Sequence, residues 1–179
     1  MQIRPARTAA ERDAIYNLRH TVYAEQERLF PARRDRRVCD SFDEIPSTTH
    51  LIALDDEQVV GAARVTLPSP AGLPTDGTFD FASALPCRRH EVGSGGMLCV
   101  HHSHRSTPRP FWGLIGLAHL WLSSRGCSHM VGTFNPDVAK FFERVGARRL
   151  GADFTHPRLG VPVTPLVEST CLESPKSVR

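Results

Sequence analysis

Two carboxylates and an arginine in the first half of the chain could recognise a charged group or move a proton. Asp40 and Asp43 stand three residues apart, and Arg64 interrupts an otherwise apolar run. A carboxylate can hold an ammonium group and help to remove its proton, so one interpretation of the pair is recognition of an amine. The other is that both aspartates cap or solvate a loop. Because an unpaired buried arginine is costly, Arg64 indicates either a salt bridge to Asp43 or Glu44 or a contact to a substrate.

The histidines and cysteines do not form a metal-binding pattern. His101, His102 and His104 fall at the end of an expected strand, where neighbouring side chains point to opposite faces. The five cysteines are scattered, odd in number and contain no Cys-x-x-Cys pair, which argues against a zinc site and a disulfide framework. We therefore expect reduced thiols, hydrogen-bonded or solvated histidines and no bound metal, with His101 left open as a base.

Helices and strands that could position these residues alternate along the chain. Residues 2–6 predict a short strand, and a capping box of Thr8 and Glu11 begins an amphipathic helix that Pro31 limits. Two β-like runs at 50–54 and 59–67 predict a hairpin. The elements expected after them are a loop at 68–78, a short apolar element at 79–85, a strand at 95–102, a helix begun by Thr107 and Pro108 and ended by Gly126, a strand at 127–134, a helix capped by Asn135, and strands within 147–154 and 161–170. This order predicts an α/β fold around a mixed sheet.

Length and composition fit one globular domain. The 179 residues are 40% hydrophobic and 23% charged, enough for one core. We expect a single domain over residues 1–172 and a disordered tail over 173–179. No apolar run approaches the roughly 18 residues of a membrane span. The N-terminus lacks the apolar core of a signal peptide, so a cytoplasmic location is expected.

The net charge is only +3, but the arginines cluster. The clusters are Arg33, Arg34, Arg36 and Arg37, then Arg88 and Arg89, then Arg105 and Arg109. They form either a solvated basic face or a surface for an acidic partner. No aromatic residues are interleaved with them, which argues against a nucleic acid as that partner.

A stretch in the second half carries a specific resemblance. Residues 97–151 contain the strand MLCVHH, the loop RSTPRP, a long helix and the segment NPDVAKFFERVG. In order and spacing they resemble the core of the GNAT (N-acetyltransferase) superfamily, and the hairpin at 50–67 extends the match. The resemblance implies a central, mostly antiparallel sheet splayed between two strands and flanked by helices. It also implies an acyltransferase in which main-chain groups freed by the splay bind a pantetheine arm and polarise a thioester carbonyl.

The resemblance also assigns roles to individual residues. The main-chain groups at the thioester are implied to belong to Leu98, Cys99 and Val100, with an amide of this strand at the oxyanion. The phosphate is implied to bind at the following helix N-terminus, near Arg105, Ser106, Thr107 and Arg109. Asn135 is expected to cap its helix and is also a candidate contact of the pantetheine arm.

The phosphate loop departs from the superfamily pattern of Arg or Gln, two residues, Gly, one residue, then Gly or Ala. Pro108 and Pro110 occupy both glycine positions. Proline has no N–H and cannot adopt the conformations of glycine, so at least two donors to a pyrophosphate are missing. At about 1.5–3 kcal/mol for each charged hydrogen bond, this weakens the hold on coenzyme A. The single phosphodiester of an acyl carrier protein needs fewer donors, and acidic carrier proteins suit the arginine clusters. Coenzyme A remains an alternative donor.

The N-terminal half resembles the acyl-homoserine-lactone synthases (autoinducer synthases) and the N-acyl amino acid synthases. This GNAT-like branch usually takes fatty acyl groups from acyl carrier protein. The segments that carry the likeness are LRHTVYAEQ (18–26), DSFDE (40–44), GAARV (61–65) and FDFASALP (79–86). The residues implied to bind the acceptor substrate are Arg19, Asp40, Asp43 and Arg64. Lactone synthases carry Glu-x-Ser-Arg before the splayed strand, but residues 91–97 contain no arginine, which favours an amine other than S-adenosylmethionine.

The groups that move protons are less well defined. Glu91 precedes the strand that positions the thioester and is the preferred general base, with an ordinary surface glutamate as the alternative. His101 is a second candidate. Many GNAT enzymes protonate the leaving thiolate with a tyrosine, but the matching position holds Phe142, which has no proton to give. Water or another group then supplies the proton, or the step needs no acid.

The sequence therefore predicts an N-acyltransferase that moves a fatty or polyketide-type acyl group to a primary amine of an amino acid or peptide. The co-substrate is acyl-phosphopantetheine on an acyl carrier protein or acyl-CoA, and no permanently bound cofactor is expected. One alternative is an acetyl-CoA-dependent small-molecule N-acetyltransferase. The other is a catalytically degenerate GNAT domain that binds a carrier protein.

Overall fold

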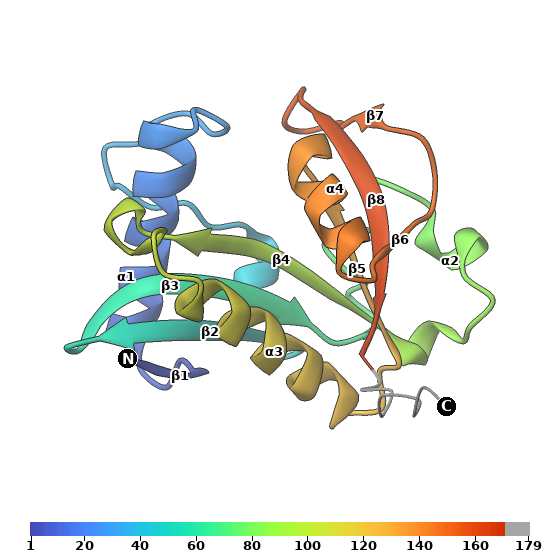
Figure 1. Ribbon diagram of the computed structural model, residues 1–179, viewed down its shortest axis with the longest axis horizontal. Coiled ribbons are helices and arrows are strands. Elements are labelled where there is room, and N and C mark those ends of the chain that lie inside the picture. The colour runs from blue at the N-terminus through green and yellow to red at the C-terminus, as the bar shows by residue number, and fades with distance from the viewer. Residues whose placement is uncertain (171–179) are drawn as a thin grey trace, which may run out of the picture.

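The computed structural model describes residues 1–170, which form a mixed, mostly antiparallel sheet with helices packed against it (Figure 1). The strands are β1 (Gln2–Pro5), β2 (Thr48–Asp55), β3 (Gln58–Thr66), β4 (Val92–Val100), β5 (His129–Phe134), β6 (Arg148–Arg149), β7 (Phe154–Thr155) and β8 (Pro162–Ser169). The helices are α1 (Ala9–Arg19), α2 (Phe81–Ala84), α3 (Arg109–Ser123) and α4 (Pro136–Arg144), with a π-helix η1 (His20–Gln26) and the 3₁₀ turns η2 (Ser41–Glu44), η3 (Arg89–Glu91) and η4 (His102–His104). The sheet order β1-β2-β3-β4-β5-β8-β6, with β7 beside β8, confirms the predicted mixed architecture.

The first helix begins where the sequence predicts. Thr8 Oγ1 accepts from the main-chain N–H of Glu11, and Glu11 accepts in return from the N–H of Thr8. This reciprocal cap satisfies two free N–H groups and fixes the start of α1. The helix then widens into η1 and ends at Gln26, short of Leu29. π-Helical segments are often found at functional sites, and η1 borders the cavity described below.

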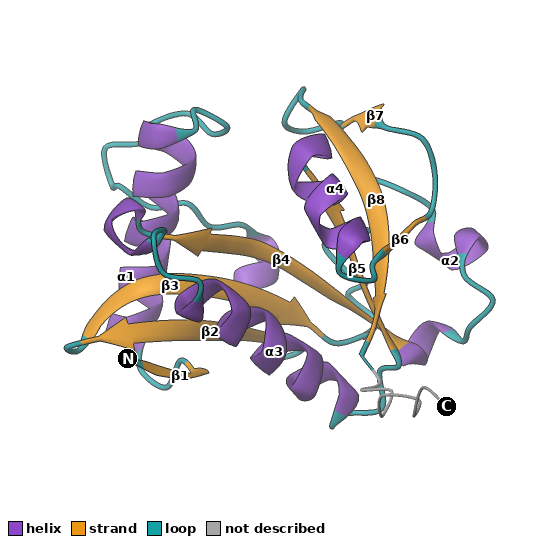
Figure 2. Ribbon diagram, viewed as in Figure 1, coloured by secondary structure: helices purple, strands orange, loops and turns teal. Residues whose placement is uncertain are grey.

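The hairpin of β2 and β3 forms the centre of two apolar layers. Leu51 and Ala53 pack with the buried face of α3, whereas Ile52 and Leu54 pack with α1. This alternation is the two-residue period of a strand buried on both faces. Figure 2 shows α1 and α3 flanking this part of the sheet.

The strands β4 and β5 run parallel and separate soon after they meet. They pair only over residues 92–94 and 129–131, although β4 continues to Val100 and β5 to Phe134. At the point of divergence a side chain on Gly132 would lie 3.0 Å from the carbonyl oxygen of Gly95, so the close approach requires glycine. The splay that the resemblance implies is therefore present, and it is visible as the V between β4 and β5 in Figure 1.

The C-terminal part differs from the prediction in one respect. The strand expected within 147–154 is two separate pairs of residues, β6 and β7, which contact different parts of β8. The expected boundary at residue 172 and the expected tail over 173–179 lie outside the described residues. Within residues 1–170, no helix combines the length and apolarity needed to cross a membrane.

Candidate active site

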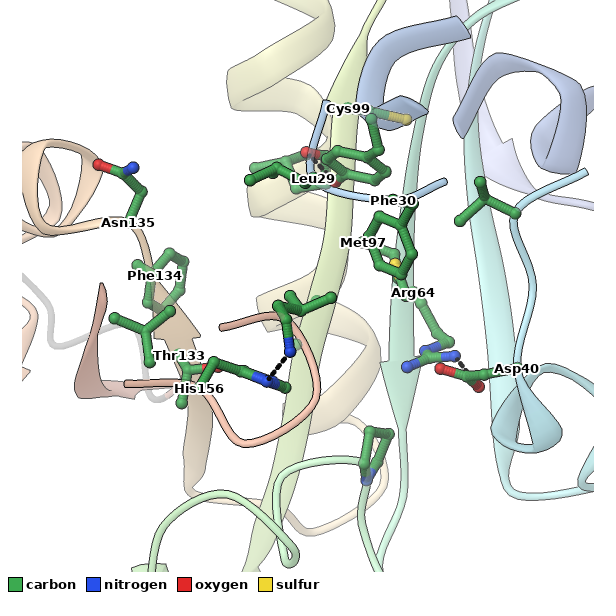
Figure 3. A pocket seen from close by; sticks show the side chains of 18 of the residues that line it. Leu29, Phe30, Asp40, Arg64, Met97, Cys99, Thr133, Phe134, Asn135 and His156 are labelled. Carbon is green, nitrogen blue, oxygen red and sulfur yellow. Dashed lines mark hydrogen bonds and ion pairs between the residues drawn. The ribbon is translucent and has the colours of Figure 1, made fainter. Parts of the chain in front are cut away.

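The divergence of β4 from β5 opens a cavity of about 1320 Å³ (Figure 3). Its walls come from η1 and the segment after it, from β4, from β5 and the start of α4, and from the loop between β7 and β8. The predicted site residues that line it are Asp40, Arg64, Leu98, Cys99, Val100, Arg105, Thr107 and Asn135. The predicted site residues that do not line it are Arg19, Asp43, Glu91, His101, Ser106 and Arg109.

The four predicted acceptor-binding residues form one ion-pair network. Asp43 Oδ1 accepts from Arg19 Nη1 at 2.8 Å and from Arg64 Nη1 at 3.0 Å, and Asp40 Oδ1 accepts from Arg64 Nη1 at 2.6 Å. Arg19 and Asp43 are fully buried behind the cavity wall. Asp40 and Arg64 reach the cavity surface, where Figure 3 shows them joined. The predicted salt bridge of Arg64 to Asp43 is therefore confirmed, and because Arg64 also lines the cavity, its contact to a substrate stays a prediction.

Electrostatics keep the centre of this network charged. Burial by itself would raise the pKa of Asp43, but Arg19 and Arg64 outweigh it and hold that pKa below its ordinary value. The main-chain N–H of Asp40 adds a hydrogen bond to Asp43 Oδ2 at 2.8 Å. His50 Nδ1 lies 3.3 Å from Arg19 Nη2. Burial is the main cause that lowers the pKa of His50, and the charge of Arg19 lowers it further. The two aspartates also cap η2, so their structural role is present together with any role toward a substrate.

A bulge in β4 shapes the main chain at the implied thioester position. The register with β3 shifts between Ala62 and Arg64, and Met97 has a φ of 51°. A left-handed conformation costs a methionine on the order of 1 kcal/mol, so the surrounding contacts must hold it. One such contact is the hydroxyl of Tyr23 in η1, which donates to the carbonyl oxygen of Leu98 at 2.7 Å.

The amide of Val100 faces the open side of the splay. The N–H of His101 donates to the carbonyl oxygen of Val60 in the antiparallel ladder. Opposed residues in such a ladder alternate between bonded and non-bonded pairs, so Val100, one residue earlier, directs its N–H away from β3. On that side β5 has already diverged and pairs with no residue beyond Ser94. Among the described residues, neither β3 nor β5 pairs with this N–H, so Val100, which lines the cavity, offers the kind of main-chain donor that an oxyanion site requires.

The phosphate loop is only partly as predicted. The prediction that Thr107 caps the following helix is wrong, because Pro108 is the N-cap and the Thr107 hydroxyl donates to the carbonyl oxygen of His104. Arg105 lines the cavity, donates to the carbonyl oxygen of Val100 at 3.0 Å and pairs with Glu27 at 3.3 Å. Arg109 instead points to the main chain of Met1.

Neither predicted base lies in the cavity. Glu91 accepts from the main-chain N–H of Arg88 at 2.8 Å and caps η3, next to the closed end of the splay. His101 bonds Ser103 at 2.7 Å on the outer surface. Burial lowers the pKa of His101, and the neighbouring His102 and His104 lower it further, but this side chain does not line the cavity. Neither placement supports a direct proton transfer.

Three further positions that the resemblance singled out, Asn135, Cys99 and Phe142, all border the cavity. Asn135 Oδ1 accepts from the N–H of Asp137, so the predicted cap of α4 is confirmed, and its side chain also borders the cavity. Cys99 is buried in the wall, where burial raises the pKa of its thiol to about 12. Phe142, at the usual tyrosine position, is buried and lines the cavity as an apolar ring. Within residues 1–170 no three His, Cys, Asp or Glu side chains are grouped to hold a metal ion.

Several cavity residues were not found by sequence reasoning. They are Tyr23, Leu29, Phe30, Met97, Phe111, Thr133, Phe134 and His156. Tyr23 stands in the recognised segment 18–26, and a polar hydroxyl in an apolar helix face was the available signal. His156 lies in a Pro- and Gly-containing loop, and its direction depends on pairing that the sequence pattern does not reveal.

Replacing Tyr23 with phenylalanine should lower the free energy of unfolding by about 1 kcal/mol, because the Leu98 carbonyl loses its bond at 2.7 Å. The matched control is Tyr16→Phe. Its hydroxyl reaches Glu44 only at 3.5 Å, so a much smaller loss is expected. Urea unfolding of both variants measures the difference. Equal losses would show that the Tyr23 hydroxyl does not hold the bulge.

Comparison with known proteins agrees with this geometry. Residues 14–168 match the sequence profile of the family described as N-acyl amino acid synthase FeeM. No curated protein sequence matches the chain. The structure of FeeM, an N-acyl amino acid synthase from uncultured soil microbes, is similar with a TM-score of 0.77 at 19% identity, over 94% of this chain and 90% of that one.

Two further structures share the fold. TofI in a ternary complex with an inhibitor and MTA has a TM-score of 0.72 at 20% identity, over 95% of this chain and 92% of TofI. MesI, a CoA-dependent acyl-homoserine lactone synthase, has a TM-score of 0.72 at 20% identity, over 96% of this chain and 90% of MesI. The GNAT-like fold, the open splay and the profile match together identify an enzyme, an N-acyltransferase. The chain belongs to the FeeM family of N-acyl amino acid synthases.

Proposed function

We propose that this enzyme transfers a fatty or polyketide-type acyl group from an acyl-carrier-protein thioester to the primary amine of an amino acid or peptide. The amine nitrogen attacks the thioester carbonyl, a C–N bond forms and the C–S bond breaks. The departing thiolate takes a proton from solvent, since Phe142 has none. The observation that carries the proposal is the Val100 amide, which faces the unpaired side of β4 and can stabilise the oxyanion.

The size and lining of the cavity support a long acyl group. Its volume of about 1320 Å³ exceeds what an acetyl group would fill. Apolar side chains from β4, α3, β5 and the segment after η1 border it, among them Met97, Phe111, Phe134 and Phe30. An acyl chain packed there would gain about 0.8 kcal/mol for each buried CH₂ group, which favours longer donors.

The start of α3 favours a single phosphodiester. Pro108 and Pro110 carry no N–H, so the main-chain donors of its first turn are those of Arg109 and Phe111. Arg105, at the cavity edge, supplies a positive charge for the phosphate. This arrangement suits the phosphopantetheine of an acidic carrier protein better than the diphosphate of coenzyme A. Acyl-CoA is the alternative donor, because MesI, whose fold is similar, is described as CoA-dependent.

Asp40 is the proposed contact of the acceptor amine. Its carboxylate reaches the cavity with 13% of the side chain exposed, whereas Asp43 behind it is fully buried. Arg64 holds Asp40 in place at 2.6 Å. In this proposal Asp40 orients the ammonium group and accepts its proton, and Asp43 keeps Arg64 in position.

The function is tested with the purified chain, a mixture of amino acids and three separate donors: a long-chain acyl carrier protein, the matching acyl-CoA, and acetyl-CoA. Mass spectrometry measures the N-acylated amine. We expect the largest turnover with the carrier protein and the smallest with acetyl-CoA. Equal or better turnover with acetyl-CoA would contradict the proposed donor. Absence of transfer from all three, with tight binding of the carrier protein, would favour a non-catalytic binding domain.

A further inference from the structure

A glutamate at the end of η1 lies beside the arginine that is expected to bind the phosphate of the donor. Glu27 follows η1 directly, and its N–H donates to the carbonyl oxygen of Val22 at 2.9 Å, which continues the wide turn of that helix. Its side chain lines the cavity and is 38% exposed. One carboxylate oxygen lies 3.3 Å from Arg105 Nη2. Arg105 is therefore already neutralised by a carboxylate of the protein.

A hydrogen-bonded network holds this ion pair at the edge of the cavity. Arg105 Nε donates to the carbonyl oxygen of Val100 at 3.0 Å, and Arg105 Nη2 also lies 3.4 Å from Gln26 Oε1. Gln26 Nε2 lies in turn 3.3 Å from His102 Nδ1. Because a guanidinium is compact and planar, one Arg105 head group joins Val100, at the proposed oxyanion site, to Glu27. A phosphate bound by Arg105 would therefore lie next to the Glu27 carboxylate.

The phosphate loop offers no surplus positive charge for a second phosphate. Pro108 and Pro110 remove two main-chain donors from the start of α3, and Arg109 does not line the cavity. Arg105 and Glu27 together carry no net charge. A single phosphodiester can take Arg105 by displacing one exposed contact of 3.3 Å. Each further phosphate group would meet the Glu27 carboxylate without a cation from this loop to compensate it.

We propose that Glu27 selects between donors by charge, so that an acyl group on a single phosphodiester is accepted and acyl-CoA is disfavoured. Coenzyme A carries a diphosphate and a further phosphate, so it brings several negative charges where a carrier-bound pantetheine arm brings one. In water, two like charges about 4 Å apart repel by an amount that changes an equilibrium constant about fivefold. This role rests on the proposed acyl transfer and deepens it, because it names a residue that sets the donor class.

Selection by charge must be separated from a structural role in positioning Arg105. Glu27→Gln keeps an oxygen that can accept from Arg105 and removes only the charge, whereas Glu27→Ala removes both. The matched control is Glu25→Gln in η1. The side chain of Glu25 is 41% exposed, pairs with Arg36 at 3.1 Å and does not line the cavity.

The assay measures kcat/KM for three donors with the same long acyl group: acyl-pantetheine, acyl carrier protein and acyl-CoA, at low ionic strength and with one saturating amino acid. Glu27→Gln should raise kcat/KM about 3- to 10-fold for acyl-CoA, less for the carrier protein, and leave acyl-pantetheine within about twofold. Glu27→Ala should shift the ratio of acyl-CoA to carrier protein equally, because the same charge is lost. Added salt should reduce the gain with acyl-CoA, since it screens exposed charges.

The outcomes separate this role from the proposed function. An equal change with all three donors, an unchanged acyl-CoA rate, or the same gain in Glu25→Gln would overturn the assignment of Glu27 while acyl transfer stands. A loss with both phosphate-bearing donors in Glu27→Gln would make Glu27 a positioning residue and would also overturn it. If the wild-type enzyme transfers the acyl group from none of the donors, the proposed function fails together with this role.

Discussion

Replacing Asp43 with alanine is expected to lower the free energy of unfolding by about 3–5 kcal/mol. The side chain is fully buried between Arg19 and Arg64, at 2.8 and 3.0 Å, and its loss leaves Arg19 charged and buried without a carboxylate. Arg64 retains Asp40 at the cavity edge, so Arg19 is the group that gains the larger penalty. Asp43→Asn keeps an acceptor oxygen but not the charge, and an intermediate loss is expected. Urea or thermal unfolding of the three proteins measures the series.

The matched control for the first prediction is Asp13→Ala, which breaks an exposed pair with Arg37. Exposed pairs contribute little to stability, so its unfolding midpoint should stay close to that of the wild type. An Asp43→Ala variant as stable as Asp13→Ala would contradict the view that the buried network holds this wall.

The same network predicts a dependence of stability on pH. The pKa of Asp43 is lower in the folded protein than in the unfolded chain, where it is about 3.9. Its contribution is therefore fully present above that unfolded value and is lost as the pH falls through the folded pKa. Wild-type stability should decline below about pH 4, and part of this decline should be missing in Asp43→Asn. Unfolding measured as a function of pH in both proteins tests the sign.

Replacing Arg105 with alanine should raise the KM for the acyl donor about 10- to 100-fold. Its guanidinium holds the carbonyl oxygen of Val100 and lies at the cavity edge beside the start of α3. Arg109→Ala is the control, because that side chain points to Met1 outside the cavity. Steady-state kinetics with acyl carrier protein should show the increase only for Arg105→Ala. Equal effects of the two variants would place the phosphate elsewhere.

The fold and half of the site were accessible from the sequence because they follow from local patterns. The Thr8–Glu11 box, the β2–β3 hairpin and the Asn135 cap are each decided by residues close in the chain, and all three are confirmed. The pairing of Arg64 with Asp43 could also be anticipated, since a buried arginine requires a carboxylate, whereas its second partner is Asp40 and not the expected alternative Glu44.

The positions of the other site residues could not be predicted, because they depend on contacts between segments that are distant in the sequence. Glu91 lies next to the start of β4, where β4 is still paired with β5. The two strands are apart at the other end of β4, nine residues later at Val100. Arg105 and Arg109 look equivalent in the sequence, but Arg105 lies in the turn after η4 and Arg109 is the first residue of α3, and they have different partners. His156 is positioned by the pairing of β7 with β8 and by the main chain of its own loop, neither of which leaves a periodic signal.

Amine acylation from a carrier-bound thioester can be tested by competition between two donors in one reaction. A carrier protein and coenzyme A are loaded with the same long acyl group in two isotopic forms, mixed in equal amounts with enzyme and a free amino acid, and the N-acyl product is analysed by mass spectrometry. We expect a product that carries mainly the label supplied on the carrier protein. A product that carries mainly the coenzyme A label, or no N-acyl product at all, would contradict it.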